Sequence, residues 1–249
     1  MSKDRLALKR FLIKGDLLTD SDIPIEDEIE LLWPIGQCNL CNYEFIEEDR
    51  GASPICPNCS SRPRQRSLPI LMNVLHKLLE PNYDGELLAF AMTSIEKKYV
   101  AHHFATIKSV SLYGNYAQNH IQGVDVRNLE RFNKGEFNGA FSSLLFDYFP
   151  EHHIALKELH RVIRKGGVFF THIANGRILG GDVPAYTHKQ VYAKENSFEY
   201  LKENSIPSIK VGRDWLFNTI DECGFDPCAL DILDSATDEY YTWFIGRRR

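Results

Sequence analysis

The sequence contains no long apolar run and no excess of positive charge. No stretch approaches the ~18–20 apolar residues that a membrane-spanning helix needs, so we expect no membrane contact. The opening residues, MSKDRLALKRFLIKGDLL, scatter charges among apolar side chains and lack a small-residue cleavage site, which argues against a signal peptide. A net charge of −5 makes a general nucleic-acid-binding protein unlikely as a class.

A GxGxxG fingerprint is also absent, which disfavours enzymes that bind nicotinamide or flavin dinucleotides. No internal repeat or low-complexity segment is visible. The overall composition, 43% hydrophobic and 25% charged over 249 residues, is typical of a globular protein, and the length is enough for one large domain and a small one. We expect it to work in the cytoplasm, where thiols stay reduced.

Cysteine is scarce outside one short segment. Four of the six cysteines form two CxxC pairs separated by fourteen residues: Cys38, Cys41, Cys56 and Cys59. Each pair can direct two thiolates at one centre, and four sulfurs make the closed tetrahedral set of a structural zinc site. Two disulfides or a redox pair are the alternatives, and a reducing compartment disfavours the first. The pattern predicts a zinc ion that folds a segment too short to build its own core.

Three alternating arginines follow the second pair, in the segment SSRPRQRSL: Arg62, Arg64 and Arg66. In an extended chain they would share one face and could bind phosphate or RNA. Alternatively, they offset the charge of a zinc tetrathiolate and of the acidic residues 47–49, and the negative net charge favours this interpretation. The other two cysteines, Cys223 and Cys228, are typical small apolar residues.

Strand and helix patterns alternate after the cysteine segment. We expect a helical, acidic leader over 1–33, a zinc-binding module over 34–67 and a large domain over 68–249. Within that domain, apolar periodicity predicts helices at 68–81, 94–105, 152–167 and 212–225 and strands at 86–92, 107–114, 137–146, 168–173 and 240–246. This alternation predicts an α/β fold with a mostly parallel sheet covered on both faces.

The stretch FNGAFSSLLFDYFPEHHIALKELHRVIRKGGVFFTHI, residues 137–173, resembles the middle of class I S-adenosylmethionine-dependent methyltransferases of the type 11 kind. Asp147 to Pro150 match the family's acidic-His-x-Pro run, and Val162 to Gly167 match the end of its next helix. The resemblance covers about 84–249. It implies a Rossmann-like sheet, mostly parallel with the last strand antiparallel, that binds S-adenosylmethionine.

Some bacterial members of this family resemble the chain more specifically. They carry a four-cysteine pair before the domain, then a Ser-x-x-Arg-x-Arg segment, matched here by Ser61, Arg64 and Arg66. They tend to replace the glycine-rich cofactor loop with a short Ala-Pro-Glu-like turn. Ala91, Met92 and Thr93 occupy that turn here, with Thr93 in place of the acidic residue.

The resemblance implies further cofactor-binding positions. The residue expected to hold the ribose hydroxyls is Asn115 rather than an acid, and a neutral amide bond is roughly half as strong as a charge-assisted one. We therefore hypothesise that cofactor affinity is weakened or that the site is partly degenerate. The remaining implied cofactor residues are Asp125 and Val126 near the adenine, and Ser143 and Leu144 at a strand end.

Methyl transfer depends mainly on positioning, and a hydroxyl or amine acceptor also benefits from a general base. The candidates near the expected pocket are Asp147, Tyr148 and His172, with His152 and His153 in addition. Each has a plainer alternative, such as capping a helix, packing against the cofactor or facing solvent. The polar segment 174–208 is either an acceptor-binding insertion, as in many family members, or a surface loop with one helix.

Three functions remain in consideration at this point. The first is a methyltransferase that acts on a small-molecule or sugar-like acceptor. The second is a catalytically degenerate scaffold or binding protein, motivated by Asn115 and the turn at Thr93. The third is an RNA or protein methyltransferase that holds its substrate with the zinc module.

Overall fold

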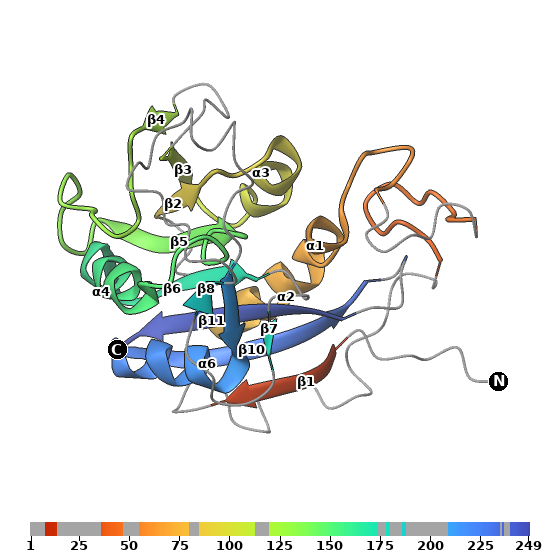
Figure 1. Ribbon diagram of the computed structural model, residues 1–249. Helices are drawn as coiled ribbons and strands as arrows, with labels where there is room; N and C mark the ends of the chain where they lie inside the picture. The colour runs from red at the N-terminus through yellow and green to blue at the C-terminus, as the bar shows by residue number, and fades with distance from the viewer. Residues whose placement is uncertain are drawn as a thin grey trace.

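The computed structural model describes residues 8–13, 36–46, 55–79, 85–112, 120–173, 178–179, 186–187, 209–234, 236 and 240–249. Its centre is an eight-stranded sheet in the order β1-β10-β11-β6-β5-β2-β3-β4, with helices on both sides (Figure 1). A smaller sheet has the order β7-β9-β8. The cysteine segment lies beside α1, at one end of the large sheet (Figure 1).

Five neighbouring strands of the large sheet run parallel. They are β2 (Glu86–Phe90), β3 (Thr106–Ser111), β4 (Ile121–Gln122), β5 (Phe137–Ser143) and β6 (Ile163–His172). The last strand, β11 (Tyr240–Arg248), pairs antiparallel with β6 and with β10 (Phe225–Leu233). The predicted fold class is therefore confirmed. Since parallel strands end at the same edge of a sheet, their carboxyl ends form the edge where ligands gather in such folds.

Two apolar cores lie on opposite faces of this sheet. Side chains alternate along β2, so that Leu88 and Phe90 join one core while Leu87 and Ala89 join the other. The first core contains α4 (His152–Val162) and α6 (Arg213–Glu222), and the second contains α2 (Leu68–Leu79) and α3 (Ser94–Val100). The helix before them is the short α1 (Pro63–Arg66).

Several expected elements differ in their ends. α4 stops at Val162 rather than near 167, because Ile163 is extended and begins β6. Gly166 adopts φ +74° within that strand, where the register against β5 shifts. The predicted helix over 94–105 is shorter, and β10 was not expected as a strand.

The expected helical leader is wrong where the structure describes it. Leu8–Ile13 form β1, which pairs antiparallel with β10. Without β1, the outer backbone groups of β10 would form an open sheet edge, so pairing gives those groups hydrogen-bond partners. The rest of 1–33 lies outside the described residues. In the segment 174–208 the structure describes only β7 (Ile178–Leu179) and β8 (Tyr186–Thr187), which flank β9 (Ile209–Gly212).

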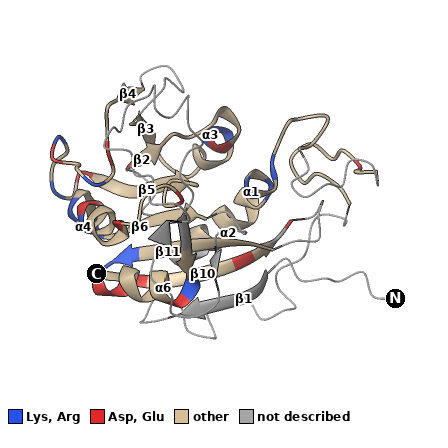
Figure 2. Ribbon diagram, viewed as in Figure 1, with Lys and Arg blue, Asp and Glu red and all other residues tan. Residues whose placement is uncertain are grey.

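Charged residues of both signs lie on the helices and at strand ends, and most strand residues are uncharged (Figure 2). Within the described ranges, no helix is long and apolar enough to cross a membrane. Two features of this fold are candidate sites: the cysteine segment and the carboxyl edge of the parallel strands.

Candidate functional site: a four-cysteine cluster and the carboxyl edge of the sheet

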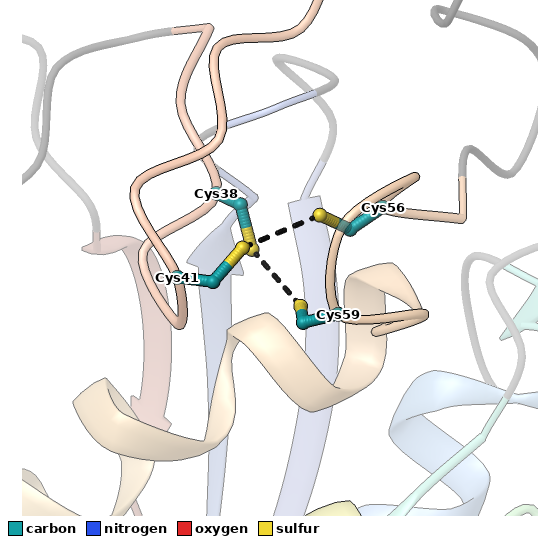
Figure 3. A group of neighbouring side chains, drawn as sticks. All are labelled: Cys38, Cys41, Cys56 and Cys59. Atoms are coloured by element: carbon teal, nitrogen blue, oxygen red, sulfur yellow. Dashed lines mark hydrogen bonds between the residues drawn. The ribbon is translucent and has the colours of Figure 1, made fainter.

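The two CxxC pairs meet at one point. The four Sγ atoms lie within 4.8 Å of one another, and the side chains converge from two loops (Figure 3). Cys38 Sγ is 3.7 Å from Cys59 Sγ, and Cys41 Sγ is 3.5 Å from Cys56 Sγ. None of the four forms a disulfide. The structure thus brings together all four residues predicted as metal ligands.

The two loops repeat the same backbone geometry. Cys38 N donates to Tyr43 O at 2.8 Å, and Cys56 N donates to Ser61 O at 2.9 Å, five residues on in both cases. The residue after each second cysteine then donates back to the first cysteine, Asn42 N to Cys38 O and Ser60 N to Cys56 O. Each loop is therefore a closed knuckle that fixes where its two sulfurs point.

These sulfurs fit a tetrahedral metal. With Zn–S bonds of ~2.3 Å, a tetrahedral site separates its sulfurs by ~3.8 Å, close to the 3.5 and 3.7 Å found here. Cys38 and Cys56 are fully buried, and burial raises the pKa of the Cys56 thiol to about 12. Ser61 Oγ lies 3.1 Å from Cys59 Sγ and 3.4 Å from Cys38 Sγ, where its hydroxyl can donate to a thiolate. The donor set is that of a closed structural site.

The three arginines after the cluster do not form one exposed face. They lie on and beside the helical turn α1, where only Arg62 is exposed. Arg66 is buried and donates to Asp234 from Nε at 2.7 Å and from Nη2 at 2.8 Å. Arg64 lies 3.4 Å from Glu96. The arginines therefore connect the cysteine segment to the large domain and do not follow the extended arrangement considered from the sequence.

The carboxyl ends of β2 and β5 lie side by side. Phe90 pairs with Ser142, and directly beyond them both chains turn through a left-handed conformation, at Ala91 (φ 48°) and at Leu144 (φ 63°). This conformation costs a residue with a side chain roughly 1–2 kcal/mol and is the one that glycine usually supplies. In the turn after β2, Ala91 therefore adopts the left-handed conformation that glycine supplies in a glycine-rich loop.

Backbone strain in the described residues is confined to the two candidate sites. Four non-glycine residues there have positive φ, two in the cysteine knuckles and two at the strand ends: Asn42, Ser60, Ala91 and Leu144. Strained backbone of this kind clusters at functional sites because the surrounding structure must hold it in place. The observation supports treating both places as sites.

A buried carboxylate organises the turn after β2. Thr93 N and Thr93 Oγ1 both donate to Glu96 Oε2, at 2.8 and 2.9 Å, and Glu96 N donates back to Thr93 Oγ1 at 3.3 Å. Glu96 is only 1% exposed. The acidic group missing at position 93 thus reaches the turn from the first turn of α3. Met92, also predicted there, is buried in the core.

Asp125 forms an ion pair with Arg127. Arg127 donates to its carboxylate from Nε at 3.0 Å and from Nη2 at 2.7 Å, and Arg127 N donates to Oδ1 at 2.9 Å. Although burial opposes ionisation, these bonds lower the pKa of Asp125. Val126 beside it is buried in the core. Asn115, the expected ribose residue, lies outside the described residues.

Ser143 supplies an unsatisfied polar atom at the same edge. Its Oγ is buried and has no hydrogen-bond partner among the described residues. A buried hydroxyl without a partner is unfavourable by about 1–3 kcal/mol, so its presence here suits a ligand that bonds to it. With the bent turns at Ala91 and Leu144, this atom fits the binding of a polar cofactor.

The three candidate catalytic residues follow β5 and end β6. Asp147 is buried in the turn after β5, and Tyr148 beside it is half-buried. His172 is 2% exposed and donates from Nδ1 to Thr242 O if that nitrogen carries the proton, with the two atoms 2.9 Å apart. Burial, with the nearby charge of Arg64, lowers the pKa of His172 to about 4, so the ring is neutral at pH 7.

His152 neither faces solvent nor caps α4 through its ring. It is fully buried, with Nε2 at 2.8 Å from Phe146 O, and its ring packs against Phe149 and Trp215. Burial lowers its pKa to about 4. His153 is exposed, as one of the alternatives expected.

Sequence reasoning missed three residues that support these sites: Gln65 on α1, Glu96 on α3, and Asp234 after β10. A sequence signal existed for one of them. Thr93 and Glu96 form a T-x-x-E capping box, a pattern that marks a helix start. The others act through contacts between segments far apart in the chain, such as Arg66 with Asp234, 168 residues apart.

Solved structures share this fold at low sequence identity. Comparable chains include a Burkholderia thailandensis 1,6-didemethyltoxoflavin-N1-methyltransferase (TM-score 0.50, 14% identity, 73% of this chain and 78% of that one). A Mesorhizobium loti S-adenosylmethionine-dependent methyltransferase gives 0.51, with 10% identity over 71% and 96%. One from Thermotoga maritima, described as a possible histamine N-methyltransferase, gives 0.50, with 15% identity over 75% and 91%. No curated protein matches the sequence.

The fold is that of class I S-adenosylmethionine-dependent methyltransferases. Residues 91–171 match the model of a family described as the methyltransferase domain. The matched segment begins at Ala91, in the bent turn after β2, and ends at Thr171, one residue before His172. The resemblance seen in the sequence is therefore confirmed, and the four-cysteine cluster stands before this domain.

Proposed function

We propose that the protein is an active S-adenosylmethionine-dependent methyltransferase for a small-molecule or sugar-like acceptor, with a structural zinc ion on its four cysteines. The observation that carries the proposal is the pair of left-handed turns at Ala91 and Leu144, at adjacent strand ends. A strained turn is retained where it serves a site, and these two flank the position of the cofactor in this fold.

Different residues of the chain hold different parts of the cofactor site. S-adenosylmethionine, when bound, supplies the electrophilic methyl group. Glu96 holds the turn at Thr93 rigid through two hydrogen bonds, so little conformational entropy is lost when a ligand binds there. The Ser143 hydroxyl has no partner among the described residues and can bond the ligand, and Asp125 presents a charged carboxylate near the adenine position.

The acceptor side contains His172, Asp147 and Tyr148. A neutral His172 keeps a lone pair on Nε2 when Nδ1 donates to Thr242 O, although a pKa of about 4 makes this nitrogen a weak base at neutral pH. Two structures with this fold are named for small nitrogen compounds, which is consistent with the proposed acceptor class. Arg64 and Arg66 lie inward, so Arg62 is the one exposed positive charge among the described residues of the cysteine segment, which gives little support to a nucleic-acid substrate.

A specific observation favours the scaffold as a second candidate. Arg127 occupies both oxygens of Asp125, so a cofactor amine would have to share this carboxylate with a guanidinium. In a scaffold, Asp125 would serve only to hold Arg127, which also contacts Glu151 at 3.2 Å. Binding of the cofactor decides between the two.

The deciding experiment is calorimetric titration of the zinc-loaded protein with S-adenosylmethionine and S-adenosylhomocysteine. We expect micromolar affinity that weakens in Asp125→Ala and remains in Asp226→Asn, whose carboxylate lies at the start of β10, on the opposite edge of the sheet. An Arg127→Met variant separates the two roles of Asp125, since it removes the ion pair and keeps the carboxylate. No binding by the folded protein at millimolar ligand would overturn the proposal.

A further inference from the structure

Gln65 links the cysteine segment directly to the cofactor turn. Its side chain is 3% exposed and makes two hydrogen bonds in opposite directions. Oε1 accepts from Arg62 N at 2.8 Å, and Nε2 donates to Thr93 Oγ1 at 3.0 Å. The first bond closes the start of α1, and the second reaches an element 28 residues further along the chain.

Both cysteine knuckles hold the helix that carries Gln65. The second knuckle runs into α1 through Ser61, whose carbonyl accepts from Cys56 N and from Arg66 Nη1, both at 2.9 Å. The first knuckle reaches the other end, where Asn39 Nδ2 donates to Arg66 O at 2.6 Å. The position of α1, and of the Gln65 amide, is therefore set by the geometry of the cysteine cluster.

The Gln65 amide completes the hydrogen bonding of the Thr93 hydroxyl. Thr93 Oγ1 donates to Glu96 Oε2 and accepts from Glu96 N and from Gln65 Nε2. Without Gln65, one acceptor position of this hydroxyl is open, and its other hydrogen bonds reach only Glu96, in the helix that Thr93 caps. The backbone of the turn is tied to the sheet at its other end, where Ala91 N donates to Val110 O at 2.8 Å, so the Gln65 amide fixes the Thr93 end of the turn.

We propose that Gln65 is a positioning residue for the cofactor turn and that it transmits the fixed geometry of the cysteine cluster to Thr93. This inference rests on the proposed function, because it requires the turn to bind a cofactor. The cysteine segment then has a role beyond its own folding, because it supports the cofactor turn. That turn lacks the glycines that let other cofactor loops approach a ligand closely.

A double-mutant cycle tests the link. The variants are Gln65→Leu, which keeps the size of the side chain and removes both bonds, Thr93→Val, which removes the hydroxyl, and the two combined. We expect each single change to weaken S-adenosylhomocysteine binding roughly 3- to 10-fold, as for one hydrogen bond, with no further loss in the double variant. Additive losses, or unchanged affinity in Gln65→Leu, would overturn the inference.

Controls separate positioning from folding. Gln37→Leu makes the same substitution in the first knuckle, where Gln37 bonds the exposed Glu44, and should leave affinity unchanged. Thr93→Ser keeps the hydroxyl and should restore the affinity lost in Thr93→Val, even if Gln65→Leu fails to fold; no restoration counts against the link. If the wild-type protein itself does not bind the ligand, the proposed function fails and this inference fails with it.

Discussion

Arg66 and Asp234 form a fully buried, two-point ion pair between the cysteine segment and the loop after β10. Both side chains are 0% exposed, and the guanidinium also lies 5.1 Å above the ring of Phe45 in the first knuckle. The pair therefore joins a knuckle, α1 and the sheet at one place. A buried charge that loses its partner is strongly unfavourable, since neither water nor another ion replaces it.

Removing one side of this pair should destabilise the whole protein. We expect Asp234→Asn to lower the free energy of unfolding by about 3–5 kcal/mol, because it removes the two-point ion pair from the buried Arg66 guanidinium. Asp226→Asn is the matched control, since Asp226 is partly exposed and lies 3.7 Å from Arg249, and it should change stability by under about 1 kcal/mol. Urea unfolding of both variants measures the difference. Equal, small effects would show that the pair contributes little.

Metal content gives a direct test of the cysteine cluster. We expect one zinc ion per purified chain and loss of that ion in Cys41→Ser, because a serine hydroxyl is a poor replacement for a thiolate ligand. Cys223→Ser should keep its zinc, since Cys223 lies away from the cluster, at the end of α6. Elemental analysis by mass spectrometry, with a thiol count after chelation, measures both. A disulfide, or zinc retained at full stoichiometry in Cys41→Ser, would contradict the assignment.

Local patterns predicted much of this molecule. The two CxxC pairs are a short-range signal, and their sulfurs meet as expected. The alternation of strand and helix predicted the mostly parallel sheet, because such alternation is typical of parallel strands joined by helices, and the family resemblance predicted that the last strand, β11, is antiparallel. The bent turn at Ala91 was located by resemblance, although its left-handed conformation was visible only in the structure.

Longer-range features could not be predicted in this way. β10 contains Pro227 and a buried Asp231, and both are residue types that strands disfavour, so the sequence pattern did not indicate a strand here. Asp231 is tolerated because Arg213 and Thr242 donate to it, from elements before and after it in the chain. The contacts of Gln65 with Thr93 and of Arg66 with Asp234 likewise depend on how α1 packs, which no local pattern specifies.

The strain at Ala91 predicts opposite effects of one substitution at two positions. Ala91→Gly should stabilise the protein by about 1 kcal/mol, because glycine adopts φ 48° without a Cβ clash. Ala101→Gly should instead destabilise it by roughly 0.5–1 kcal/mol, because Ala101, the C-cap residue of α3, has right-handed helical dihedrals, with φ −62°, that alanine adopts without strain. Thermal and urea unfolding of the two variants measures the signs. Destabilisation by Ala91→Gly would contradict strain at the turn.

Two buried histidines predict a loss of stability in mild acid. Burial lowers the pKa of His152 and of His172 to about 4 each, from an ordinary value near 6.5. Between these values the unfolded chain binds protons that the folded chain does not, so stability falls as the pH drops from about 6.5 towards 4. A shift of this size corresponds to roughly 3 kcal/mol for each ring.

His152→Gln separates this effect from general acid denaturation. Glutamine can still donate to Phe146 O but cannot take up a proton, so the variant should lose less stability between pH 6.5 and pH 4.5 than the wild-type protein does. His153→Gln, one position along the same helix and exposed, should follow the wild-type curve. Urea unfolding at several pH values measures the slopes. If His152→Gln kept the wild-type slope, another group would have to bind the protons taken up on unfolding.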